Sequence, residues 1–221
     1  MFSSYFDSTN LRPEATADDI RMLCQEAMDY EMAAVCIHPF RLALASQMLK
    51  GSRVKACTVI GFPLGAEKMK TKLYSARTAL TDGADELDMV INIGMVKDKK
   101  FTEIEREIKN ILELKNEYEF LLKVIVETAL LEEFELVYLT EIISLAEADF
   151  IKTSTGFSAR GVSIQDIAII NAHKSKELKI KASGGIRELD FALELINIGV
   201  HRIGSSNARF LVEEFRKKGG L

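Results

Sequence analysis

Eight short apolar runs alternate with longer amphipathic segments along the chain, and this alternation limits the fold more than any other feature. Alternating strands and helices imply parallel strands joined by right-handed helical crossovers. The expected strands are SYFDST (4–9), AAVCIHP (33–39), VKACTVIGF (54–62), ELDMVINIG (86–94), FLLKVIVET (120–128), FIKTST (150–155), IKASGG (180–185) and RIGSS (202–206). The helices expected between and after them cover 17–30, 40–49, 68–81, 102–116, 131–147, 163–177, 189–198 and 207–218.

Eight similar units in 221 residues predict a compact α/β fold, a TIM (β/α)8 barrel with a short N-terminal extension, as a single domain over residues 1–221. The chain is 48% hydrophobic with only 3 prolines, which suits one large core. A doubly wound open sheet is the alternative. It is weaker because eight similar units leave no place where the strand order reverses.

Composition excludes several classes of function. The net charge of -4 offers no basic field for nucleic acid, and no apolar run reaches the ~18 residues of a membrane helix. The N-terminus lacks the pattern of a signal peptide. The 3 cysteines lack CxxC spacing and the 3 histidines lack metal-ligand spacing. We therefore expect a cytoplasmic protein with reduced thiols and no bound metal.

Period-two alternation separates the two faces of each expected strand. In the fourth strand, Leu87, Met89 and Ile91 share the face that should meet the helices, while Glu86, Asp88, Val90 and Asn92 share the other. The same parity turns further polar and reactive side chains toward the lumen, namely Cys36, His38, Lys123, Glu127, Lys152 and Lys181. Packing alone does not require so many charged side chains in the lumen, so they need another explanation.

Two interpretations of the lumen charges remain open at this point. One is a network of structural ion pairs, to which Lys123 and Glu127 are assigned. The other is amine chemistry, because a lysine beside a second cation loses its proton more easily and becomes a nucleophile toward carbonyls. If Asp88 reached only one of Lys152 and Lys181, that lysine would stay charged and the other would be neutral.

Glycine-bearing turns follow the last two strands, at Gly184-Gly185 and at Gly204-Ser205-Ser206. Each turn lies where a strand ends and a helix begins, so backbone N–H groups and the positive end of the helix dipole can face an anion. TIM barrels often bind phosphate at this location. The two turns together, with Arg187 nearby, favour a phosphate site.

The motifs resemble one family, deoxyribose-phosphate aldolase, a class I aldolase on a TIM barrel. The matching segments run in family order along essentially the whole chain: DSTNL (7–11), AAVCIHP (33–39), ELDMVINIG (86–94), KVIVETALL (123–131), FIKTSTGF (150–157), KASGGIR (181–187) and RIGSS (202–206). KTSTG and KASGG carry the two lysines, and convergence on both at this spacing is improbable.

The resemblance implies a reaction and three catalytic roles. Lys152 matches the lysine that forms the Schiff base, Lys181 the second lysine that helps it lose its proton, and Asp88 the acid of a proton relay through water. The implied reaction is reversible cleavage of 2-deoxy-D-ribose 5-phosphate into D-glyceraldehyde 3-phosphate and acetaldehyde, in deoxyribose phosphate catabolism. It needs no cofactor, because the protonated imine is the electron sink.

The resemblance also implies positions that bind the substrate. Contacts to the sugar are expected from Asp7, Thr9, Cys36, Thr153 and Thr155. For Cys36 the alternative is a small buried apolar residue that only packs. The phosphate shell is expected at Gly156, Gly184, Gly185, Gly204, Ser205 and Ser206. The chain departs from some relatives at Phe157, where they have lysine, and at Asn207, where others have Ser or Gly.

Two other functions stay open. One is another class I aldolase for a different sugar phosphate or keto acid, against which the pairing of KTSTG with KASGG argues. The other is a non-catalytic barrel that binds a phosphorylated metabolite, against which the intact Asp88, Lys152 and Lys181 argue. The expected partners are a small sugar phosphate, aldehydes and further copies of the chain in a dimer or tetramer, without nucleic acid or membrane.

Overall fold

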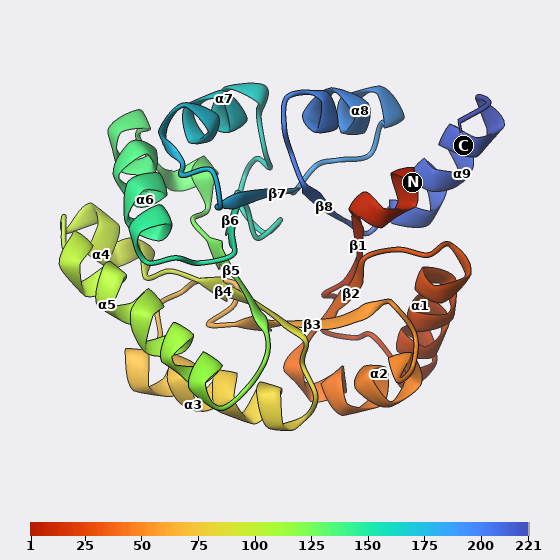
Figure 1. Ribbon diagram of the computed structural model, residues 1–221, viewed down its shortest axis with the longest axis horizontal. Helices are drawn as coiled ribbons and strands as arrows, with labels where there is room; N and C mark the ends of the chain where they lie inside the picture. The colour runs from red at the N-terminus through yellow and green to blue at the C-terminus, as the bar shows by residue number, and fades with distance from the viewer. Residues whose placement is uncertain (221) are drawn as a thin grey trace.

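The computed structural model describes residues 1–220 as a closed barrel of parallel strands enclosed by helices (Figure 1). Strand order follows chain order, and β8 pairs with β1 to close the barrel. The predicted TIM barrel is confirmed, and the open sheet is excluded because each strand has two neighbours. The strands are β1 (Phe6–Asn10), β2 (Ala34–Ile37), β3 (Lys55–Ile60), β4 (Glu86–Val90), β5 (Leu121–Ile125), β6 (Phe150–Lys152), β7 (Lys179–Ser183) and β8 (Arg202–Ser205).

The helices form the outer layer of the barrel (Figure 1). They are α1 (Ala17–Asp29), α2 (Leu42–Leu49), α3 (Met69–Thr81), α4 (Ile93–Lys97), α5 (Phe101–Leu112), α6 (Glu133–Leu145), α7 (Ile164–His173), α8 (Leu189–Asn197) and α9 (Ala208–Lys217). Short 3-10 helices are η1 (Phe2–Tyr5), η2 (Pro39–Arg41), η3 (Glu113–Asn116) and η4 (Thr128–Leu130). The short N-terminal extension is η1, whose Phe2 stacks on Phe215 of α9 with ring centroids 4.3 Å apart. Among the described helices, none is long and apolar enough to cross a membrane.

The two faces of the strands pack as the alternation predicted. Leu87 and Met89 of β4 are fully buried in the cluster shared with the helices. Inside the barrel, Cys36 of β2 and Cys57 of β3 are neighbours in the strand register and belong to a separate small cluster. The outward faces therefore make the main apolar core, and the lumen is left for polar groups.

One side-chain cap explains why β4 is shorter than the sequence predicted. The expected strand 86–94 ends at Val90, and α4 begins at Ile93 inside the predicted range. Asn92 causes this, because its Oδ1 accepts a hydrogen bond from the N–H of Met95 at 3.1 Å and so caps a helix. The turn matters for the site, because it ends β4 two residues after Asp88.

Candidate active site

Lys152 and Lys181 are neighbours across two strands of the barrel. Lys152 ends the short strand β6, and its register partner in β7 is Lys181. Both side chains are almost fully buried, at 3% and 0% exposure. Lys152 lines a cavity at the carboxyl ends of the strands, whereas Lys181 lies beneath it and does not line the cavity. Lys152 is therefore the amine that a bound carbonyl compound can reach.

Asp88 of β4 contacts three lysines at once. Its Oδ2 accepts hydrogen bonds from Lys152 Nζ and Lys181 Nζ, each at 2.7 Å, and its Oδ1 accepts one from Lys123 Nζ at 2.8 Å. Burial opposes ionisation of Asp88, but the three ammonium groups outweigh it and hold the pKa of this carboxyl well below its usual value. Asp88 therefore does not distinguish Lys152 from Lys181, because one of its oxygen atoms binds both amines.

Asp7 of β1 distinguishes the two lysines instead. Its Oδ2 accepts a hydrogen bond from Lys181 Nζ at 2.5 Å, and its Oδ1 accepts one from Arg202 at 2.5 Å. Burial disfavours the charged form of Lys181, yet Asp7 and Asp88 outweigh it and raise the pKa of this lysine. Among the described residues, Lys152 has Asp88 as its one carboxylate partner. Lys181 is thus a fixed cation, and Lys152 is held less tightly.

The lumen carries more cations than carboxylates. Its ion pairs are 2.5 to 3.7 Å long and join Lys123, Lys152, Lys181 and Arg202 to Asp7, Glu86 and Asp88. Loss of one proton from the cations balances the charges of this network. Of the four cations, Lys152 has the fewest carboxylate partners, and it reaches the cavity. A neutral amine beside a cation is what attack on a carbonyl requires.

The cavity has a volume of about 520 Å³ and opens at the ends of β1, β6, β7 and β8. Of the predicted site residues, it is lined by Thr9, Lys152, Thr155, Gly156, Gly184, Gly185, Gly204, Ser205 and Ser206. It is also lined by Phe157, whose ring packs edge-to-face on Phe62 with centroids 5.2 Å apart. The structure thus brings both glycine-bearing turns to the same cavity as Lys152.

Left-handed glycines form the turn after β7. Gly184 has φ 82° and Gly185 has φ 75°, and a Cβ on Gly184 would lie 2.8 Å from the Cα of Gly161. Ser205 connects this turn to the one after β8, because its hydroxyl donates to the carbonyl of Ile186 at 2.9 Å and accepts from the N–H of Asn207 at 3.0 Å. The two turns are held together as one wall.

Three predicted substrate contacts, Asp7, Thr153 and Cys36, do not line the cavity. Thr153 instead secures the β6–β7 pairing: its hydroxyl donates to the carbonyl of Ser183 at 3.3 Å and accepts from the Ser183 N–H at 3.1 Å. Cys36 is fully buried below the cavity, with Sγ 3.7 Å from Asp88 Oδ2. A hydrogen bond from Cys57 outweighs burial and lowers the pKa of the Cys36 thiol.

Of the two residues expected in the supporting charged network, Lys123 lies in it and Glu127 does not. Lys123 pairs with Asp7, Glu86 and Asp88. The backbone turns into the left-handed region at Glu127, with φ 56°, and its carboxylate binds Thr155 instead. The expectation is therefore confirmed for Lys123 and wrong for Glu127.

Two groups of side chains have the spacing of metal ligands, Cys36–Cys57–Asp88 and Asp7–Cys57–Glu86. In both groups the acidic oxygens already bind ammonium or guanidinium groups, and Lys123 Nζ lies 3.3 Å from Cys57 Sγ. A metal ion would have to displace these cations. The donor set therefore favours lysine chemistry over metal binding.

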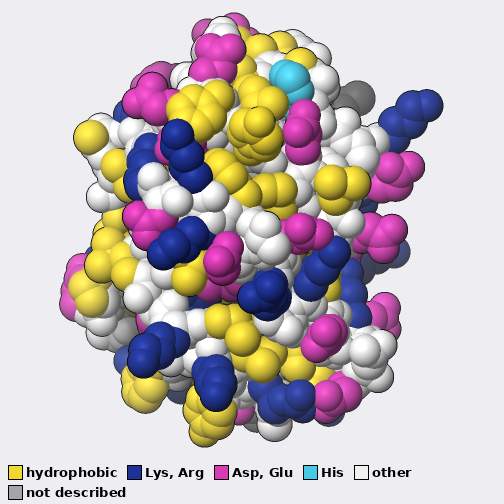
Figure 2. Space-filling view, turned by 90° about the vertical axis from the view of Figure 1, so that its left-hand side faces the viewer, with side chains coloured by type: hydrophobic (Ala, Val, Ile, Leu, Met, Phe, Trp, Pro, Cys, Tyr) yellow, Lys and Arg dark blue, Asp and Glu magenta, His cyan; other side chains and the backbone are white. Residues whose placement is uncertain are grey.

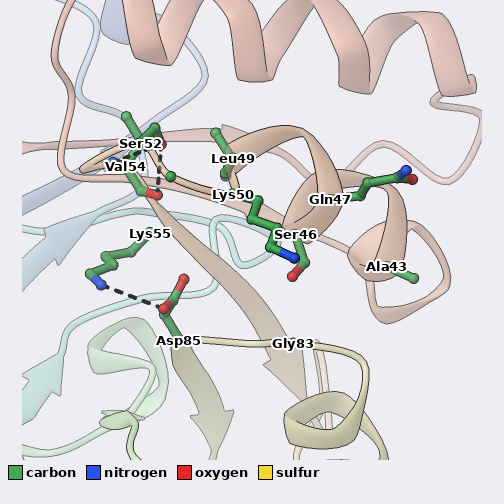
Figure 3. A pocket seen from close by; sticks show the side chains of 11 residues that line it. Ala43, Ser46, Gln47, Leu49, Lys50, Ser52, Val54, Lys55, Gly83 and Asp85 are labelled. Carbon is green, nitrogen blue, oxygen red and sulfur yellow. Dashed lines mark hydrogen bonds and ion pairs between the residues drawn. The ribbon is translucent and has the colours of Figure 1, made fainter.

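A second cavity, of about 590 Å³, lies at the opposite ends of the strands, near the starts of β3 and β4 (Figure 3). Lys55 and Asp85 line it and form an ion pair of 3.5 Å. Both side chains are about half exposed, and none of the lumen lysines lines this cavity. It therefore lacks the chemistry of the cavity at Lys152.

Two arginines of the site escaped the sequence reasoning. Arg202 begins β8 beside Lys181 in the strand register and binds Asp7, so closing the barrel between β8 and β1 would have revealed it. Arg12 follows DSTNL and lines the cavity together with Arg187. No local pattern marks Arg12, because its place depends on the course of the loop after β1.

An amine nucleophile, a neighbouring fixed cation and an anion-binding wall at the mouth of a TIM barrel fit the class of imine-forming aldolases. A family model described as DeoC/LacD family aldolase matches residues 3–204. The chain belongs to this family of aldolases, and the resemblance inferred from its motifs is confirmed.

Individual proteins extend the similarity over nearly the whole chain. A deoxyribose-phosphate aldolase of Thermococcus kodakarensis is 46% identical over 211 residues, which are 95% of this chain and 94% of that protein. A structure titled "QR15, an Aldolase" has a TM-score of 0.93 at 38% identity and covers 99% of this chain and 97% of its own. The deoxyribose phosphate aldolase of Aeropyrum pernix, described as tetrameric, has a TM-score of 0.91 at 34% identity. The match covers 98% of this chain and 92% of that protein's chain.

Proposed function

We propose that this protein reversibly cleaves 2-deoxy-D-ribose 5-phosphate into D-glyceraldehyde 3-phosphate and acetaldehyde through a Schiff base on Lys152. The observation that carries the proposal is the position of Lys152 Nζ, which lines the cavity 2.7 Å from Asp88 Oδ2 and next to the fixed cation Lys181. The names of the similar proteins supply the substrate class.

The reaction uses the neutral amine of Lys152. Its nitrogen attacks the C1 aldehyde of the open-chain sugar, and loss of water leaves a protonated imine. The C3 hydroxyl then gives up its proton while the C2–C3 bond breaks, so the electron pair moves into the imine and D-glyceraldehyde 3-phosphate leaves. The resulting enamine takes a proton at C2, and hydrolysis of the new imine releases acetaldehyde and the free amine.

Asp88 and Lys181 are the proposed proton carriers. The carboxylate of Asp88 lies within hydrogen-bonding distance of both amines, so it connects them directly. Its depressed pKa keeps it ionised at neutral pH, so it can accept hydrogen bonds from the reacting groups. Lys181, held charged by Asp7, is the matching donor and places a positive charge next to the proposed nucleophile.

The phosphate group of the substrate is assigned to the wall formed by Gly184, Gly185 and the 204–206 turn. Backbone N–H groups there bind an anion without depending on side-chain identity. Arg12 and Arg187 line the same cavity and add positive charge. Thr9 and Thr155 are assigned to the sugar.

The test is the release of both aldehydes from deoxyribose 5-phosphate, with Lys152→Met as the inactive variant and Lys72→Met as its control. Lys72 is another fully buried lysine, on α3 and outside the lumen. We expect Lys152→Met to lose at least ~10³-fold in kcat. Faster cleavage of another sugar phosphate would favour a different aldolase, and folded wild-type protein without activity would favour the non-catalytic barrel.

We also propose a homo-oligomer in the cytoplasm, built from one domain that spans the chain. The Aeropyrum pernix relative is described as tetrameric, and all three cysteines here are buried free thiols, as suits a reducing compartment. On the face formed by α4, α5 and α6, apolar side chains gather among charged ones (Figure 2). Phe134, Tyr138 and Leu145 of α6 are 47%, 52% and 75% exposed. Light scattering of the purified protein measures the number of subunits.

A further inference from the structure

Glu127 is a buried and strained acidic residue that the proposed reaction does not use. It follows β5 and is 2% exposed. Its φ of 56° lies in the left-handed region, which is energetically unfavourable for a residue with a Cβ. Among residues 1–220, its Oε1 is buried without a hydrogen-bond partner. A strained backbone and an unpaired buried oxygen both destabilise the fold, and such costs are concentrated at functional sites.

The other oxygen of Glu127 fixes the direction in which the Thr155 hydroxyl donates its hydrogen bond. Glu127 Oε2 accepts a hydrogen bond from the backbone N–H of Thr155 at 3.2 Å and a short one from its hydroxyl. The Thr155 hydroxyl in turn accepts a hydrogen bond from the N–H of Phe157 at 3.1 Å. The one proton of this hydroxyl is therefore committed to Glu127, and one of its two lone pairs is committed to Phe157.

The remaining lone pair of the Thr155 hydroxyl is what a ligand can use. Thr155 lines the cavity three residues after Lys152. A hydroxyl in this state accepts a hydrogen bond and cannot donate one, so it selects for a donor on the substrate. Holding the strands together does not explain Glu127, because the backbone N–H of Thr128 already bonds the carbonyl of Thr153 at 2.8 Å.

We propose that Glu127 is a positioning residue that makes the Thr155 hydroxyl an obligate hydrogen-bond acceptor, so that this wall of the cavity favours aldehydes bearing a hydroxyl group. The inference rests on the proposed aldolase function and adds a determinant of its specificity. Glu127 acts through Thr155 and does not touch the reacting atoms. A substrate without the hydroxyl leaves the Thr155 oxygen without its partner, and sites of this kind discriminate against such analogues.

The test measures the aldol addition of acetaldehyde to two acceptor aldehydes. D-glyceraldehyde carries hydroxyl groups, and propanal carries none. Glu127→Ala should lower kcat/KM for D-glyceraldehyde relative to propanal by about tenfold, as expected for loss of one hydrogen bond to the substrate. Glu127→Gln should keep most of the preference, because its amide oxygen can accept both hydrogen bonds from Thr155. Thr155→Val should resemble Glu127→Ala, and Thr155→Ser should resemble the wild type.

The control is Glu147→Ala. Glu147 is also left-handed, with φ 60°, but it is exposed and makes no side-chain hydrogen bond among the described residues, so its variant should leave the preference unchanged. Borohydride trapping of the acetaldehyde imine should be equal in the wild type, Glu127→Ala, Glu127→Gln and Glu147→Ala. Absence of the imine in the wild type would overturn the proposed function itself. Normal trapping with an unaltered preference in both Glu127→Ala and Thr155→Val would overturn this inference alone.

Discussion

Replacing Lys181 by leucine removes a fixed positive charge from beside the proposed nucleophile. The amines of Lys181 and Lys152 bind the same oxygen of Asp88, each at 2.7 Å. Two unit charges at the resulting separation, roughly 5 Å, repel by about 3 kcal/mol at an effective dielectric constant near 20. This energy corresponds to about two pH units. Because a neighbouring cation favours the neutral amine, its removal shifts the pH needed for activity upward.

We therefore expect Lys181→Leu to lose ~10²-fold in kcat/KM at pH 7 and to regain part of it near pH 9. Asp7 keeps Arg202 as a partner at 2.5 Å, so the lumen retains part of its network in the variant. The assay is cleavage of deoxyribose 5-phosphate across pH. Lys72→Met, a buried lysine paired with Glu107 at 2.9 Å outside the lumen, should leave the pH profile unchanged. Near-normal turnover of Lys181→Leu with the wild-type profile would refute the charge coupling.

Asp88→Asn should abolish proton transfer and leave three buried ammonium groups poorly paired, at a cost of about 3–5 kcal/mol in urea unfolding. The depressed pKa of Asp88 makes its stabilisation complete above about pH 4 and progressively lost as pH falls, so the variant should show a weaker loss of stability in acid. Gly185→Asp should remove most of the preference for deoxyribose 5-phosphate over deoxyribose, Phe157→Lys should strengthen it by roughly 1 kcal/mol, and Gly185→Ala controls for strain at φ 75°; kcat/KM for the two sugars decides. Lys72→Met should lower the free energy of unfolding by about 3–5 kcal/mol and Lys72→Met/Glu107→Leu should recover much of it, because only the single variant leaves a buried charge unpaired.

The barrel could be predicted from the sequence because its strands and helices have different hydrophobic periods. The alternation along 86–92 correctly predicted that Leu87 faces the helices and that Asp88 faces the lumen. The end of β4 could not be predicted from apolar content, because the Asn92 cap, a local hydrogen bond, overrides it. Apolar residues continue past Val90, so hydrophobicity alone extends the strand too far.

The site was predictable as a set of residues but not as a set of contacts. Strand parity and the family motifs led to Lys152, Lys181 and Asp88, which the structure joins through one carboxylate. Which lysine receives a second carboxylate depends on β8 closing against β1, since this brings Asp7 to Lys181. Such closure is a property of the whole barrel, so no local pattern could supply it.

Chemical trapping tests the central claim most directly. The protein is incubated with deoxyribose 5-phosphate, reduced with borohydride and mapped by peptide mass spectrometry. Surface lysines stay protonated at neutral pH, so we predict one reduced adduct, at Lys152. An adduct on Lys181, or cleavage activity without any lysine adduct, would contradict the account.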